Sequence, residues 1–132
     1  MKKKILIIDD DEDLLAALKE RLHIHGFRCV TATCAIQGFK KARSTKPDLI
    51  LLDLGLGDMS GYGFLRKLKT EQTISQIPVV ILSGQNDEEV VREGIELGAV
   101  GYLNKKCGAR ALVATIQDYS SKNNLKEMTA VH

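Results

Sequence analysis

The sequence is poor in several residue types that mark specialised classes of protein. It has no tryptophan, two prolines and three cysteines in 132 residues, and aromatic residues make up only 5% of it. The cysteines, Cys29, Cys34 and Cys107, have no Cys-x-x-Cys spacing and cannot all pair. We therefore expect free, idle thiols rather than a disulfide scaffold or a zinc site, and a cytoplasmic location in a reducing compartment.

Neither sign of charge dominates, and no apolar stretch is long. The 19 basic and 17 acidic residues are interleaved and leave a net charge of +2, which argues against direct binding to nucleic acid. The apolar runs are too short to cross a bilayer, and the lysines at residues 2–4 precede a short apolar run without a cleavage site. We expect one domain with no membrane insertion.

The chain does contain two short apolar runs that end in carboxylates. Residues 5–8 lead into three aspartates at 9–11, and residues 49–52 lead into Asp53. Runs of this kind are typical of strands buried on both faces of a parallel sheet. Neighbouring parallel strands end at one edge, where open α/β sheets bind ligands, so the carboxylates should converge there. Grouped carboxylates repel one another unless a cation lies among them, and oxygen ligands suit Mg²⁺ or Mn²⁺.

Strand and helix patterns alternate along the whole chain, which predicts a doubly wound parallel α/β sheet with helices on both faces. The second helix should bury Ile36, Phe39 and Ala42. Residues 122–132 are polar, and we expect a frayed tail or truncated linker after a domain of residues 1–121. The expected strands are 4–8, 29–32, 49–52, 79–82 and 101–104, and the expected helices are 12–25, 35–44, 62–69, 88–97 and 109–121.

Four blocks of residues resemble the signature blocks of response-regulator receiver domains. The resemblance spans residues 3–121 and implies a flavodoxin-like sheet of five parallel strands in the order 2-1-3-4-5, with five helices. It also implies a signalling protein that catalyses only its own phosphorylation and dephosphorylation. The blocks are Ile-Ile-Asp-Asp-Asp at 7–11, Leu-Leu-Asp-Leu at 51–54 with Gly61, Ile-Leu-Ser-Gly at 81–84, and Gly-Ala-Val-Gly-Tyr-Leu-Asn-Lys at 98–105.

The resemblance assigns roles to the acidic residues. Asp53 matches the phosphoacceptor, whose carboxylate attacks a phosphohistidine, and carboxylates are known to form such aspartyl phosphates. Asp9 and Asp10 match the pair that holds Mg²⁺, together with Asp53 and the backbone carbonyl of Gly55. The alternative role for the first aspartates is helix capping, for which Asp11 is the better candidate because it lies nearest the helix.

The resemblance also assigns roles around the acceptor. Lys105 and Ser83 match residues that contact the phosphoryl oxygens, and Tyr102 matches the aromatic switch residue that moves inward together with Ser83. Gly55 and Gln85 occupy the two positions that tune hydrolysis of the phosphorylated form. From the residues alone, simpler interpretations stay open: an exposed lysine, a turn-forming Ser-Gly pair and a half-buried strand tyrosine.

The implied partners are a sensor histidine kinase or histidine phosphotransfer protein upstream and an effector protein or domain downstream. The readout surface would comprise the helix at 88–97, Tyr102 and the last helix. Many family members have proline where this chain has Lys106, so we expect a trans peptide after Lys105.

Two other classes of protein stay open at this point. A pseudo-receiver regulated by binding alone would lack the acceptor, the acidic pair or the lysine, and none of these is missing. A haloacid-dehalogenase-like phosphatase would need a second acidic residue two positions after its nucleophile, where this chain has Gly55.

Overall fold

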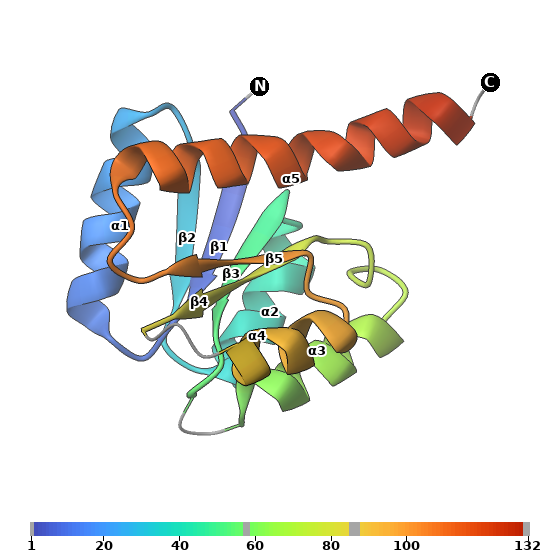
Figure 1. Cartoon of the computed structure of the whole chain (residues 1–132), viewed down its shortest axis with the longest axis horizontal. Coiled ribbons are helices and arrows are strands. Elements are labelled where there is room, and N and C mark those ends of the chain that lie inside the picture. The colour runs from blue at the N-terminus through green and yellow to red at the C-terminus, as the bar shows by residue number, and fades with distance from the viewer. Residues whose placement is uncertain (1, 57–58, 85–87, 131–132) are drawn as a thin grey trace.

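Strands and helices alternate along the described chain, five of each (Figure 1). The computed structural model describes residues 2–56, 59–84 and 88–130, with side chains as far as Ser120. The elements are β1 (Lys4–Ile8), α1 (Glu12–Ile24), β2 (Arg28–Ala32), α2 (Ala35–Thr45), β3 (Leu49–Asp53), α3 (Gly61–Thr70), β4 (Val79–Ser83), α4 (Glu88–Glu96), β5 (Gly101–Asn104) and α5 (Ala109–Ala130).

The five strands form one parallel sheet in the order β2-β1-β3-β4-β5, which confirms the predicted flavodoxin-like topology. The residues of β1 and β3 point alternately to the two faces. Ile5 and Ile7 pack with α1 and α5, whereas Leu6 and Ile8 pack with α2 and α3. Figure 1 shows the same division, with α4 on the side of α2 and α3. The continuous apolar runs in the sequence reflect strands that are buried on both faces.

Local signals at the ends of α1 place the loop that follows β1. The Asp11 carboxylate accepts the N–H groups of Asp13 and Leu14, both at 3.1 Å, so Asp11 is the N-cap, as predicted. After the helix, Gly26 has φ +87°, a left-handed conformation in which glycine is not strained. The cap fixes where the preceding aspartates leave the sheet.

Two details of the sequence prediction are wrong. The last helix continues to Ala130 and extends past the sheet (Figure 1), because residues 109–130 contain no glycine or proline to end it. Ile36 is 58% exposed, since the buried face of α2 is formed by Ala35, Gly38, Phe39 and Ala42. The domain boundary at residue 121 stays a prediction. None of the described helices combines the length and apolar character needed to cross a membrane.

Candidate functional site

The predicted acidic residues lie together at the carboxyl edge of the sheet. Asp9 and Asp10 follow β1, Asp53 ends β3, and the register pairs Ile8 with Leu52 in these neighbouring strands. As a result, each of the three aspartates offers a carboxylate oxygen within 4.8 Å of the other two. The parallel topology therefore brings residues 9, 10 and 53 into one cluster.

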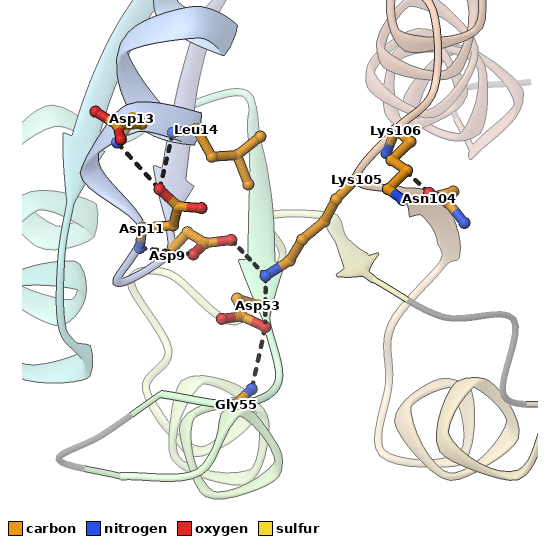
Figure 2. Close-up of polar contacts among 9 residues, drawn as sticks. All are labelled: Asp9, Asp11, Asp13, Leu14, Asp53, Gly55, Asn104, Lys105 and Lys106. Carbon is orange, nitrogen blue, oxygen red and sulfur yellow. Dashed lines mark hydrogen bonds and ion pairs between the residues drawn. The ribbon is translucent and has the colours of Figure 1, made fainter.

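Asp9 is the most buried acid of the cluster, with no exposed surface. Its Oδ1 accepts the Asp11 N–H at 2.9 Å, and its Oδ2 lies 2.9 Å from Lys105 Nζ (Figure 2). Burial raises the pKa of Asp9, the Asp11 N–H and the Lys105 ammonium oppose that effect, and the charge of Asp53 adds to it. Apart from the ion pair, Asp9 Oδ2 has no hydrogen-bond partner among the described residues.

Lys105 bridges the acids that follow the two central strands. Its ammonium lies 3.3 Å from Asp53 Oδ1 as well as 2.9 Å from Asp9 Oδ2. Burial acts to lower the pKa of Lys105, but the two carboxylates outweigh it and raise the pKa, so the side chain stays charged. The three carboxylates of the cluster still exceed this one cation by two charges. A divalent cation would balance that excess.

Asp53 faces the more open side of the site. It is 8% exposed, and its Oδ1 accepts the Gly55 N–H at 3.1 Å. A Cβ at Gly55 would lie 3.8 Å from that oxygen, an ordinary contact. At Gly61 a Cβ would lie 2.4 Å from Leu54 Cα, so only glycine fits where α3 begins against the end of β3. The loop is thus fixed at Gly61 and open at Gly55.

The predicted switch residues lie on β4 and β5. Ser83 is half-buried at the end of β4, and its carbonyl accepts the Lys105 N–H at 2.8 Å. Tyr102 on β5 is 46% exposed. Gln85 lies outside the described residues.

The sequence reasoning missed the role of Asn104 in the turn after β5. Its Oδ1 accepts the Lys106 N–H at 2.8 Å, and its backbone carbonyl accepts the Cys107 N–H at 2.9 Å (Figure 2 shows the first bond). No peptide bond among the described residues is cis, so the bond between Lys105 and Lys106 is trans, as expected. The signal was available, because asparagine commonly bonds the backbone two residues further on in turns.

A cavity of about 690 Å³ lies away from the acidic cluster, beside α1 and β2. Its single carboxylate excludes it as an acidic metal site. Burial raises the pKa of Cys29, in its wall, to about 11, which agrees with an idle thiol. The lining residues are Lys2, Ala16, Lys19, Glu20, His23, Phe27, Arg28 and Cys29.

The model of the response regulator receiver domain family matches residues 5–117, which include every residue of the acidic cluster and Lys105. The chain belongs to the response-regulator receiver family. This receiver domain is 34% identical over 115 residues to the phosphate regulon transcriptional regulatory protein PhoB of Pseudomonas aeruginosa, covering 87% of this chain and 50% of PhoB. It spans about half the length of the curated relatives it matches.

Solved structures agree with this assignment. The CheY-like receiver domain protein of Methanospirillum hungatei is 26% identical, with a TM-score of 0.86 over 96% of this receiver domain and 99% of that chain. The receiver domain of the Pseudomonas aeruginosa sensor histidine kinase PA1611 has a TM-score of 0.84 at 21% identity, over 92% and 99% of the two chains. That protein holds a magnesium ion in its active site cleft. The comparisons confirm the predicted family and fold.

Proposed function

We propose that Asp53 accepts a phosphoryl group from a phosphohistidine of a sensor histidine kinase or histidine phosphotransfer protein in the cytoplasm. One observation carries this proposal: the carboxylate of Asp53 clusters with those of Asp9 and Asp10 and lies 3.3 Å from the Lys105 ammonium. An acceptor of this kind needs a carboxylate at an accessible edge with positive charge beside it.

The residues of the cluster fit Mg²⁺ or Mn²⁺. Three carboxylates supply the oxygen ligands that these ions prefer, and the buried Asp9 Oδ2 has no partner among the described residues other than the Lys105 ammonium. We propose that Asp9, Asp10, Asp53 and the backbone carbonyl of Gly55 hold the ion. The magnesium ion of the PA1611 receiver domain supports this assignment. When bound, the ion would neutralise charge on the phosphoryl oxygens and on the acceptor.

Residues of this chain would orient the acceptor and bind the transferred phosphoryl group. As the new P–O bond to Asp53 forms, the P–N bond to histidine breaks, and the departing imidazole takes a proton from solvent. The Gly55 N–H and Lys105 hold Asp53 Oδ1 in place. After transfer, the Lys105 ammonium and the Ser83 hydroxyl would bind phosphoryl oxygens. Gly55, which has no side chain beside the phosphoryl group, and Gln85 would together tune the rate at which the phosphorylated form is hydrolysed.

Phosphorylation would then change a surface formed by α4, β5 and α5. The phosphoryl group adds about −1.5 to −2 charge. Ser83 can bind it in only one loop arrangement, so the modification shifts an existing equilibrium toward that arrangement. Three apolar side chains here are between 41% and 46% exposed: Ile95 in α4, Val100 in the segment between α4 and β5, and Tyr102 in β5. They would form an apolar contact for an effector protein or domain.

The test is labelling by acetyl phosphate with Mg²⁺, followed by intact-protein mass spectrometry. Asp53→Asn should abolish labelling, whereas Asp118→Asn, on the exposed surface of α5, should leave it unchanged. Undiminished labelling of Asp53→Asn would remove Asp53 from the proposed role. A wild-type protein that is neither labelled nor binds Mg²⁺ would instead be a pseudo-receiver. Repeated turnover of a phosphate monoester would indicate a phosphatase.

A further inference from the structure

The turn after β5 is held by its own hydrogen bonds. The Asn104 side chain accepts the Lys106 N–H at 2.8 Å, and the Asn104 carbonyl accepts the Cys107 N–H at 2.9 Å. The Cys107 carbonyl in turn accepts from Arg21 Nη1 on α1 at 3.3 Å. The turn is therefore closed on itself and attached to a helix packed on the sheet.

Lys105 is the first central residue of this turn, and its backbone is held on both sides. Its N–H donates to the Ser83 carbonyl at 2.8 Å, which fixes it to the end of β4. The next N–H, that of Lys106, is held by the Asn104 side chain. These two contacts set the direction in which the Lys105 side chain leaves the sheet. The Lys105 side chain is flexible, so the carboxylates that its ammonium can reach depend on where its backbone leaves the sheet.

We propose that Asn104 is a positioning residue: its side chain closes the turn so that the Lys105 ammonium reaches Asp53 and Asp9. This inference rests on the proposed function, in which Lys105 stabilises the phosphoryl group. In this role Asn104 acts through Lys105. Its bond to Lys106 is at the exposed surface, where water can replace a lost partner, so its removal should affect the site more than it affects folding.

The contribution of the side chain can be isolated with three variants. Asn104→Ala removes the acceptor, and Asn104→Asp keeps it. Asp48→Ala is a matched control, because Asp48 Oδ2 accepts the Lys4 N–H at 2.8 Å at the exposed surface, where β1 begins, at the opposite edge of the sheet from Lys105. We expect Asn104→Ala to slow acetyl phosphate labelling about tenfold, because small displacements of a catalytic group are costly. Asn104→Asp should restore most of the rate, and Asp48→Ala should match the wild type.

Two further measurements separate positioning from a general structural effect. The Mg²⁺ affinity of Asn104→Ala should not fall, since Asn104 is no ligand, whereas a disordered site would lose both activities. In a Lys105→Met background, Asn104→Ala should slow labelling no further, because the two residues act in series. Equal slowing in both backgrounds, or an Asp variant as slow as the Ala variant, would overturn the inference.

The positioning role can also be judged without phosphorylation. In a metal-free crystal structure of Asn104→Ala, the distance from Lys105 Nζ to Asp53 Oδ1, 3.3 Å here, should lengthen. An unchanged distance would overturn the positioning role. Failure of the wild type to be labelled would count against the proposed function alone.

Discussion

The two loops that carry the acids of the receiver site differ in how they are held. In the loop after β1, Asp9 is fully buried and bonded to the Asp11 N–H, and Asp11 caps α1. Asp53 ends β3, is 8% exposed and is followed in the next loop by the exposed Gly55. Lys105 contacts an acid of each loop.

This difference suits the two loops to different roles within one site. In the first loop Asp9 is held by the Asp11 N–H and Lys105, whereas Asp10 is exposed, which suits a pair that would offer a metal ion one fixed and one accessible carboxylate. The second loop leaves room beside Asp53, the proposed acceptor, which suits a residue that would meet a phosphoryl donor and whose phosphorylated form would later react with water. Both loops start from strands buried on each face, so the contrast arises in the few residues after each strand ends.

The largest expected effect concerns the metal and the first loop. Asp10→Asn should weaken Mg²⁺ binding roughly tenfold to hundredfold, or about 1.4–2.8 kcal/mol, because the attraction of a unit charge for a divalent ion at about 4 Å, about 8 kcal/mol at an effective dielectric of 20, is largely offset by the cost of desolvating the carboxylate and the ion. Asp11→Asn is the matched control, because asparagine caps helices as well as aspartate does. Calorimetric titration of both variants measures the difference. Equal losses would mean that the loop acts by its total charge and not through Asp10 as a ligand.

A smaller effect is expected from glycines of the second loop. Gly61→Ala should destabilise the fold by about 1–3 kcal/mol, because its Cβ would lie 2.4 Å from backbone that cannot yield. Gly55→Ala should change stability by less than about 0.5 kcal/mol, since its Cβ meets only Asp53 Oδ1 at 3.8 Å. Urea unfolding of both variants checks this contrast. If the two variants are equally stable, the loop is not fixed at the start of α3.

The sequence was sufficient for the fold and for the acidic cluster. The apolar runs that end in carboxylates predict strands buried on both faces of a parallel sheet, and a short stretch of residues is enough for that prediction. The same topology brings Asp9 and Asp53 together, and Asp10 follows Asp9 directly in the chain.

The predictions that were wrong or missing concern features that the pattern of residue types does not encode. Ile36 is exposed because one turn of α2 presents Ala35 and Gly38 to the core, a rotation of the helix that a list of apolar residues does not define. The end of α5 was misplaced because polar composition was interpreted as loss of structure, although helix breakers are absent there. The turn at Asn104 was missed although asparagine commonly bonds the backbone two residues further on, because the residue type alone does not show which turn it closes or that the turn carries Lys105.

The smallest expected effect is the pH dependence of metal-free stability. Burial, above all, raises the pKa of Asp9 from 3.8, so the folded protein binds this proton more tightly than the unfolded chain does. The contribution of Asp9 to stability should therefore increase as the pH falls through its raised pKa toward 3.8.

Glu71 acts in the opposite direction, because Arg43 lowers its pKa and its contribution is lost on acidification. The useful quantity is thus the difference between the wild type and Asp9→Asn, measured by urea unfolding in EDTA from neutral pH to about pH 4. That difference should shift in favour of the wild type as the pH falls. Saturating Mg²⁺ should reverse the direction in which this difference changes with pH, because metal binding favours the charged carboxylate. If the stability difference between the wild type and Asp9→Asn in EDTA does not change with pH, the first loop holds Asp9 without a desolvation cost. The two loops would then differ in exposure alone.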